Sequence, residues 1–246
     1  MIIQPEIFGK ITAYKANDLV ILKQYPDNYF DWTVADPNYG IGVSKPSKKN
    51  NRVKQSNGTY LYTADSNYKH KDWDNDVPPK EYFDELFRVS KNQIIFGVNY
   101  FDDPRLVGGR IVWDKLNGES DQMGCEIAYC SVNNRTDVIY YMWRGMMQGI
   151  YCGRNIHKAL VQQGNKALNE KRIHPTQKPT LIYKYFMLNY MKSGDKLLDS
   201  RGGSFSQAIA AHDLDFELTI IENDEEYYDK GTTWLKWHQR QQKIFR

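Results

Sequence analysis

The sequence of 246 residues has no long hydrophobic run and few cysteines. No stretch approaches the roughly 20 apolar residues that cross a bilayer, and residues 1–10 lack the basic-then-apolar order of a signal peptide. The three cysteines, Cys125, Cys130 and Cys152, form no Cys-x-x-Cys pair and no zinc-finger spacing. These absences predict a soluble, cytoplasmic protein with reduced, mostly buried thiols, no membrane partner and no metal site.

The chain also lacks a large excess of charge of either sign, since its net charge is only +3. The position of the charges therefore says more about partners than their total does. A hydrophobic content of 41% and an aromatic content of 14% are enough for a buried core. Neither an internal repeat nor a long low-complexity linker is present, so residues 1–246 are predicted to form one domain.

The last third of the chain alternates between helical and strand patterns. Helices are expected at 180–191, 204–212 and from 224 onward, and strands at 196–199 and 217–222. Earlier, strands are expected at 11–13, 31–35, 93–98, 110–113 and 126–130, with helices at 17–23 and 80–89. This alternation predicts an α/β fold with a mostly parallel sheet covered by helices on both faces. Ligands of such sheets bind beyond the carboxyl ends of the strands.

A glycine pair follows the strand expected at 196–199. Gly202 and Gly203 allow a tight turn and close approach of a ligand to the backbone before the next helix begins. One strand later, Glu222 stands where a carboxylate commonly binds both ribose hydroxyls of a nucleotide. Taken alone, Gly202 and Gly203 are also typical of an ordinary turn, and Glu222 is also typical of a helix-capping acid.

A second group, Asp36, Pro37, Asn38 and Tyr39, follows the strand expected at 31–35. A carboxylate and a backbone carbonyl can accept both N–H bonds of an exocyclic amine and stabilise the positive charge that develops on its nitrogen. Pro37 restrains the turn so that its carbonyl points at a substrate, and the Tyr39 ring offers a stacking face for an extruded base. Asp-Pro-Asn is also common in plain surface turns.

Three segments together resemble the N6-adenine/N4-cytosine DNA methyltransferases in the permuted order of their β class. Residues 31–40 are similar to motif IV (D-P-P-Y), and residues 172–179 match the H-P-T-Q-K-P signature that precedes the cofactor strand. Residues 194–210 are similar to motif I, with the acid of motif II at Glu222. The similarity spans roughly residues 11–227, and it implies a Rossmann-like class I fold that uses S-adenosyl-L-methionine.

The resemblance also assigns roles. It implies that Asp36, Pro37, Asn38 and Tyr39 hold a flipped base for direct methyl transfer. An aspartate at the start of motif IV, where N4-cytosine enzymes typically have serine, favours N6 of adenine. The residues that the resemblance places at the cofactor are Asp18, His174, Thr176, Lys178, Asp199, Gly202, Gly203, Ser204, Phe205 and Glu222.

Two residues depart from the family pattern. Asn38 stands in place of a second proline, which implies a looser loop that keeps the reacting groups. Phe205 replaces a glycine of the pattern D-P-F-x-G-S-G and is expected to crowd the cofactor unless its side chain turns away.

Basic residues mark two candidate DNA contacts. Residues 43–80 are interpreted as a DNA-contacting loop and residues 141–173 as a target-recognition region, where basic side chains alternate with Tyr141, Trp143 and Tyr151. The residues predicted to contact double-stranded DNA are Lys45, Lys48, Lys49, Arg52, Lys54, Arg144 and Arg154. A solvated loop is the alternative for the first group, and the resemblance leaves a homodimer open.

The sequence thus favours a site-specific adenine-N6 DNA methyltransferase, as found in restriction-modification systems. An N4-cytosine methyltransferase and a catalytically degenerate DNA-binding relic of the same fold are the alternatives.

Overall fold

A computed structural model describes residues 3–42, 52–54, 57–62, 71–117, 123–144, 147–150 and 169–241 of the chain. No helix within these ranges is long and apolar enough to cross a membrane.

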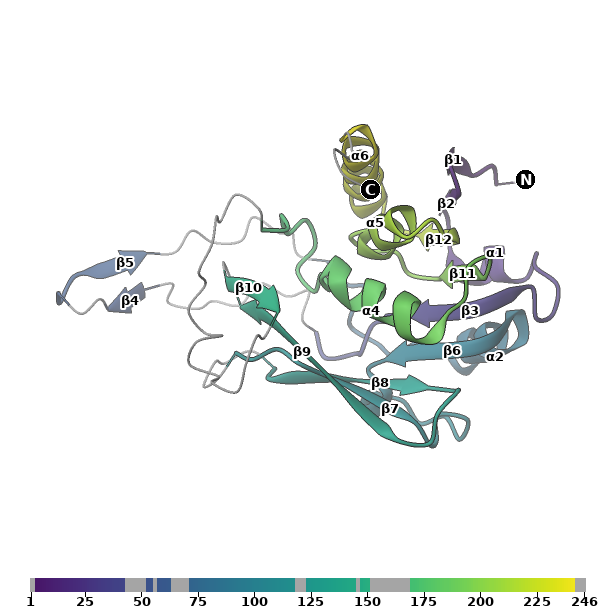
Figure 1. Cartoon of the computed structure of the whole chain (residues 1–246), viewed down its shortest axis with the longest axis horizontal. Helices are drawn as coiled ribbons and strands as arrows, with labels where there is room; N and C mark the ends of the chain where they lie inside the picture. Colours follow the sequence, from purple (N-terminus) through teal and green to yellow (C-terminus); the bar gives the residue numbers. More distant parts are fainter. Residues whose placement is uncertain are drawn as a thin grey trace.

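The strands of the described residues form a ten-stranded mixed sheet and a separate hairpin (Figure 1). The order in the large sheet is β1-β2-β12-β11-β3-β6-β8-β7-β9-β10. The strands are β1 (Glu6–Phe8), β2 (Ile11–Lys15), β3 (Phe30–Ala35), β6 (Ser90–Phe96), β7 (Arg110–Asp114), β8 (Cys125–Cys130), β9 (Thr136–Arg144), β10 (Met147–Ile150), β11 (Lys196–Asp199) and β12 (Glu217–Glu222). The hairpin pairs β4 (Arg52–Lys54) with β5 (Tyr60–Tyr62) and projects away from the body of the molecule (Figure 1).

Five neighbouring strands, β2, β12, β11, β3 and β6, run parallel. Strands β8 and β7 then extend the sheet in antiparallel fashion, and β9 returns parallel to β7. The mostly parallel sheet that the sequence predicts is therefore present, within a mixed sheet that also contains antiparallel pairs. Because the parallel strands share one direction, their carboxyl ends meet at a single edge.

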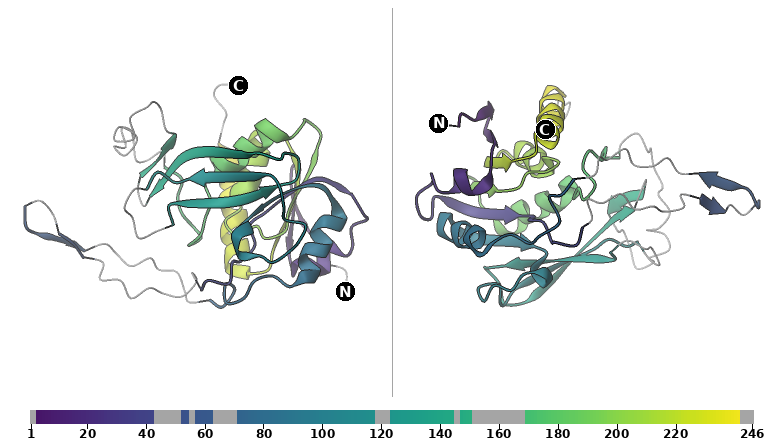
Figure 2. Two further views of the ribbon diagram at one scale, coloured as in Figure 1. Left: turned by 90° about the horizontal axis from the view of Figure 1, so that it is seen from below. Right: turned by 180° about the vertical axis from the view of Figure 1, so that it is seen from behind.

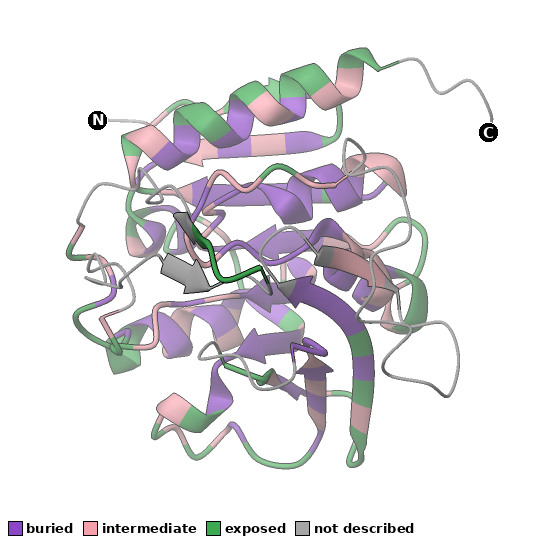
Figure 3. Ribbon diagram, turned by 90° about the vertical axis from the view of Figure 1, so that its left-hand side faces the viewer, coloured by how far each residue is buried: buried purple, intermediate pink, exposed green. Residues whose placement is uncertain are grey.

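Helices cover both faces of the sheet (Figure 2). One face carries α1 (Asp18–Leu22) and α2 (Lys80–Val89), and the other carries α4 (Thr180–Tyr190), α5 (Ser206–Asp213) and α6 (Glu225–Arg240). Each face has its own hydrophobic core, and the parallel strands between them are largely buried (Figure 3). A short 3-10 helix, η1 (Val98–Tyr100), follows β6.

The sequence explains where the helices begin. The side chain of Asn17 accepts a hydrogen bond from Val20 N at the start of α1, and Asp224 does the same for Tyr227 N at the start of α6. Pro79 and Pro179 directly precede α2 and α4, where a residue without an N–H costs nothing.

Most expected elements are found within two residues of their predicted ends. The strand expected at 93–98 instead runs from Ser90 to Phe96, because Gly97 adopts a left-handed conformation (φ +73°) that starts η1. Strands β1, β4, β5, β9 and β10 were not predicted. Of the thiols, Cys130 is buried but Cys125 is exposed, and Cys152 lies outside the described residues.

Candidate active site

Three predicted acids lie side by side at the carboxyl edge of the parallel strands. Asp36 directly follows β3, Asp199 ends β11 and Glu222 ends β12, which are neighbours in the sheet. Burial is the main cause that raises the pKa of all three carboxyl groups above their ordinary values. A concentration of buried and half-buried acids at one edge favours a cationic or hydrogen-bond-donating ligand.

The turn after β11 needs its glycines. A Cβ atom on Gly202 would lie 2.6 Å from Cγ1 of Ile220, so only glycine lets the backbone pass this close to the sheet. Gly203 has a φ of +49°. A Cβ atom built on it would have the His174 ring 3.9 Å away and the carbonyl oxygen of Arg201, in the same turn, 4.0 Å away. The N–H of Gly203 donates to Oε2 of Glu222 at 2.7 Å, while Asp224 N donates to Oε1 at 2.6 Å. The turn and the Glu222 carboxylate are thus held in one fixed arrangement.

Asp18 lies beside this turn from the other side. Its Oδ2 accepts from Nε of Arg201 at 2.8 Å, and its Oδ1 accepts from Leu19 N at 2.8 Å. Ser204, the next predicted residue after the glycines, is buried, and its hydroxyl lies 2.9 Å from that of Ser206. The structure therefore brings Asp18, the glycine turn and Glu222 together.

Phe205 is fully buried and its side chain turns into the core. Its ring packs edge-on against Tyr228 at 5.7 Å and fills the space over Gly231 of α6. The backbone at Phe205 is left-handed (φ +63°), a conformation that favours the glycine of the family pattern. The side chain therefore turns into the core toward α6, which is the exception that the sequence left open, and Cε2 of the ring lies 3.4 Å from a Cβ built on Gly202.

The segment 173–179 is a latch between the two halves of the edge. Nδ1 of His174 lies 3.1 Å from the hydroxyl of Thr176, and its ring packs against Tyr227 at a centroid distance of 4.1 Å. Burial, with a smaller effect from Lys178, lowers the pKa of His174 to about 3, so its imidazole is neutral. Gln177 accepts a hydrogen bond from Ile173 N at 2.8 Å, which closes the loop on itself.

Lys178, predicted at the cofactor, points to residues 36–40, the predicted catalytic loop. Its Nζ forms ion pairs with Asp36 Oδ1 and with Glu126 Oε2, the latter at 2.9 Å, and donates to the Tyr39 hydroxyl at 3.2 Å. The side chain is 2% exposed. Such a buried ammonium is stable only because two carboxylates surround it. In the structure the Lys178 ammonium therefore pairs with the carboxylates of Asp36 and Glu126.

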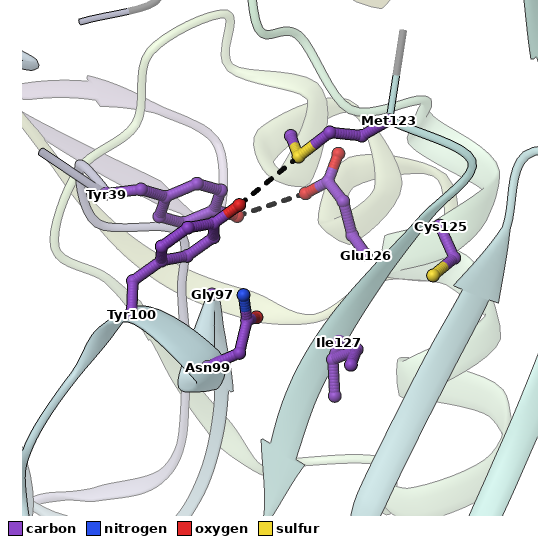
Figure 4. A pocket seen from close by; sticks show the side chains of 8 residues that line it. All are labelled: Tyr39, Gly97, Asn99, Tyr100, Met123, Cys125, Glu126 and Ile127. Carbon is purple, nitrogen blue, oxygen red and sulfur yellow. Dashed lines mark hydrogen bonds between the residues drawn. The ribbon is translucent and has the colours of Figure 1, made fainter. Parts of the chain in front are cut away.

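Tyr39 is the central ring of the catalytic loop. Its hydroxyl lies between two carboxylates, 2.8 Å from Asp36 Oδ1 and 3.0 Å from Glu126 Oε2. One ring face stacks on Tyr100 (5.0 Å between centroids, 13° between planes), and a Cβ on Gly97 would lie 2.2 Å from Cε1 of Tyr39. Figure 4 shows the two tyrosine rings side by side, with the Tyr39 hydroxyl aimed at Glu126.

A small cavity of about 110 Å³ opens beside these rings (Figure 4). It is lined by Tyr39, Gly97, Asn99, Tyr100, Met123, Cys125, Glu126 and Ile127. The cavity borders the same tyrosine and glutamate that surround Lys178. It therefore adjoins the predicted catalytic loop.

Residues 71–76 cover this edge, and we call them the cover segment. Oδ1 of Asp74 accepts from the backbone N–H of Tyr39 at 2.8 Å and of Gly40 at 3.1 Å, and Asn38 Nδ2 donates to the carbonyl of Asp76. At its other end Lys71 forms ion pairs with Asp224 at 2.6 Å and Glu226 at 3.1 Å. Asn38, the departure from motif IV, thus anchors the cover segment.

The predicted DNA contacts lie mostly outside the described side chains. Lys45, Lys48, Lys49 and Arg154 lie outside the described residues, and for Arg52, Lys54 and Arg144 only the backbone is described, in β4 and β9. Tyr141 and Trp143, which were expected to interleave with basic residues in target recognition, are buried. Trp143 Nε1 donates to the carbonyl of Gln177 at 2.9 Å, so its ring packs against the latch.

Sequence reasoning missed Glu126 and Lys115 as site residues. Both belonged to segments interpreted only as middle strands of the sheet, yet the Lys115 ammonium is 2.7 Å from Glu126 Oε1. The available signal was a charged residue in an otherwise apolar strand, because charge on a buried strand requires a partner.

No protein-family model and no curated protein matches the sequence. Solved structures do match. The PvuII DNA methyltransferase, which is cytosine-N4-specific, aligns over 96% of this chain and 88% of its own, with 10% identity and a TM-score of 0.52.

The chain has the class I methyltransferase fold. This confirms the Rossmann-like architecture that the sequence predicts, and the likeness extends to the fold alone. The complex of M1.HpyAVI with SAM (15% identity, TM-score 0.49, 91% of this chain and 99% of that one) also matches. So does a putative DNA modification methylase from Thermus thermophilus, complexed with S-adenosyl-L-methionine (13% identity, TM-score 0.46, 92% and 95%).

Proposed function

We propose that the protein is an S-adenosyl-L-methionine-dependent DNA methyltransferase that modifies N6 of adenine. The observation that carries the proposal is the position of the Asp36 carboxylate. It follows β3 at the same sheet edge as the glycine turn after β11 and the Glu222 carboxylate after β12, in a methyltransferase fold. The base-handling group and the cofactor-handling group are thus neighbours.

The residues at the turn fit this cofactor. Gly203 presents backbone with no side chain of its own above it, Glu222 retains lone pairs for ribose hydroxyls, and the ring of Phe205 is withdrawn into the core. Asp18 and Ser204 lie beside the same turn. When bound, S-adenosyl-L-methionine supplies an electrophilic methyl group.

The chain's own contribution to the reaction is to orient the amine and receive its proton. An exocyclic aromatic amine is a weak nucleophile, and acceptors at both of its N–H bonds favour the pyramidal nitrogen of the transition state. In this proposal the Asp36 carboxylate and the Pro37 carbonyl are those acceptors. Burial raises the pKa of Asp36, so this carboxylate accepts the proton that nitrogen loses after the new C–N bond forms.

The aromatic pair beside Asp36 supplies the stacking surface. Tyr100 covers one face of Tyr39 in the structure, so a flipped base that stacks on Tyr39 takes the place of Tyr100. The duplex that supplies this base is expected to contact basic residues of the segments 43–80 and 141–173. That contact makes binding depend steeply on salt.

The decisive experiment is transfer of labelled methyl from S-adenosyl-L-methionine to unmethylated genomic DNA, followed by mass spectrometry of the nucleosides. Wild-type protein should produce N6-methyladenine. Asp36→Asn should lower the rate by about 100-fold or more and leave cofactor affinity nearly unchanged.

Asp137→Asn is the matched control. Its carboxylate is 18% exposed against 20% for Asp36, but it pairs with Arg135 and Tyr190, away from the site. N4-methylcytosine as the product would transfer the proposal to cytosine. Absence of transfer with intact, salt-sensitive DNA binding would establish the degenerate relic in its place.

A further inference from the structure

We propose that Glu126 is a positioning residue that keeps Asp36 an effective proton acceptor by sharing Lys178 with it. This inference rests on the proposed function and assigns a role to a residue of β8 in that same site. Asp36, the Lys178 ammonium and Glu126 form a row in which one cation lies between two anions.

The contacts of Glu126 tie its carboxylate to the groups around Asp36. Oε2 contacts Lys178 at 2.9 Å and the Tyr39 hydroxyl at 3.0 Å, while Oε1 contacts Lys115 at 2.7 Å. The side chain is 9% exposed. Both oxygens are therefore committed to groups that surround the catalytic loop.

Sharing changes what Lys178 does to Asp36. An ammonium with one carboxylate partner neutralises it and weakens it as a hydrogen-bond acceptor and as a base. A second carboxylate draws the ammonium toward itself and adds a negative charge close to the first. Glu126 therefore opposes the effect of Lys178 on Asp36, and Lys115 compensates the charge of Glu126 from its other side.

The directions of the pKa shifts of Asp36 and Glu126 agree with these opposing effects. Burial raises the pKa of Asp36, Lys178 lowers it and Glu126 raises it again, with a net increase. Burial alone would raise the pKa of Glu126, but Lys178 and Lys115 together hold it below its usual range. Two carboxylates whose pKa values are moved apart are suited to separate tasks. Asp36 binds and releases a proton, while Glu126 stays ionised.

The groups that face Asp36 come from every element around it. The electrostatic partners of Asp36 are Tyr39 from its own loop, Glu126 from β8, Lys178 from the latch, Tyr183 from α4 and Asp199 from β11. Lys115 acts on Glu126 and Glu222 acts on Asp199. Apart from Lys178, the direct partners are acids or neutral phenols. Removal of one negative charge beside Lys178 therefore shifts the balance toward a more acidic Asp36.

The proton transfer has a simple balance. As the C–N bond forms, the bond between the methyl carbon and its leaving group breaks and the nitrogen becomes positive. The N–H proton then passes to Asp36, and the N–H electron pair stays on nitrogen. Glu126 touches neither the methyl group nor the base in this scheme, so it acts only through Lys178 and Tyr39.

The test compares Glu126→Gln with wild type by the pH dependence of single-turnover methyl transfer. The acidic limb, where Asp36 becomes protonated, should move to lower pH, and the plateau rate should fall by about 10- to 100-fold. The affinity for S-adenosyl-L-methionine should not change. Lys178→Met should move the limb the opposite way, to higher pH.

A readout without catalysis separates this inference from the proposed function. Difference infrared spectroscopy of wild type against Asp36→Asn reports the protonated carboxyl band of Asp36, and the same titration in the Glu126→Gln background should show it at lower pH. Glu85→Gln, which alters a partly buried carboxylate paired with Arg88 on α2, is the matched control and should leave the titration unchanged. An unchanged or upward-shifted Asp36 titration in Glu126→Gln overturns the inference, even if methyl transfer is never detected.

Discussion

The contact between Phe205 and Gly231 allows a sharp test of why this chain tolerates a phenylalanine after its glycine turn. Gly231 lies inside α6, where alanine normally stabilises a helix by about 1 kcal/mol relative to glycine. Here an added Cβ would lie 2.2 Å from Cδ2 and 2.6 Å from Cγ of Phe205. Phe205 is fully buried and has no room to retreat.

Gly231→Ala should therefore destabilise the protein, because overpacking of a close-packed core costs about 1–3 kcal/mol and exceeds the helix gain. In a Phe205→Ala background the ring is absent, and the same substitution should become stabilising by about 1 kcal/mol. The two effects differ by roughly 3 kcal/mol, which is the coupling energy expected for directly packed residues.

The assay is urea unfolding of the four proteins of this double-mutant cycle. Phe205→Ala alone should cost about 3–5 kcal/mol, and Phe205→Leu serves if that variant is too unstable to measure. If Gly231→Ala is neutral or stabilising in the wild type, or the coupling is below about 0.5 kcal/mol, the ring does not fill this space and its proposed withdrawal from the cofactor is refuted.

Two further substitutions probe the site. Gly97→Ala would place a Cβ 2.2 Å from Cε1 of Tyr39 at a backbone φ of +73°; it should lower the unfolding free energy by about 1–3 kcal/mol and abolish methyl transfer with little effect on cofactor affinity, and unchanged values in both thermal unfolding and transfer assays would contradict this contact. His174→Phe should remove a pH dependence of stability. The folded pKa of His174 is about 3 against an ordinary 6.5, so between these values the unfolded state binds the extra proton. The unfolding free energy of the wild type should then fall as pH drops below 6.5, by up to about 1.4 kcal/mol per pH unit from this residue. Urea unfolding at pH 5 and pH 8 should show a smaller difference in unfolding free energy for the variant than for the wild type.

Local patterns predict the helices and parallel strands well because the signal is local. The helix at Lys80–Val89 has its predicted ends, since Pro79 precedes it and buried Tyr82, Phe83 and Leu86 recur on one face. Strand β9 was missed for the opposite reason. Its residues Tyr141, Met142 and Trp143 are buried in succession, and the two aromatic residues among them were interpreted as part of a DNA-reading surface.

The candidate site was predicted in its parts but not in its connections. The resemblance indicated the residues of the glycine turn and the catalytic loop, and the structure brings them to one edge. It did not indicate that Lys178 reaches Asp36 and Glu126, which both pair with its ammonium although they lie far apart in sequence. Contacts of this kind follow from how β8, β3 and the latch meet in space, and no local pattern encodes them.

The cover segment has a thermodynamic consequence. Asp74 holds the backbone of the catalytic loop, and Lys71 holds the start of α6, which follows Glu222. In the proposed reaction, a ligand that displaces the whole segment loses both sets of contacts, and this loss is part of its binding free energy. By reciprocity, whichever of the proposed cofactor and DNA displaces the segment first makes the other bind more tightly, by the same factor in either order of addition.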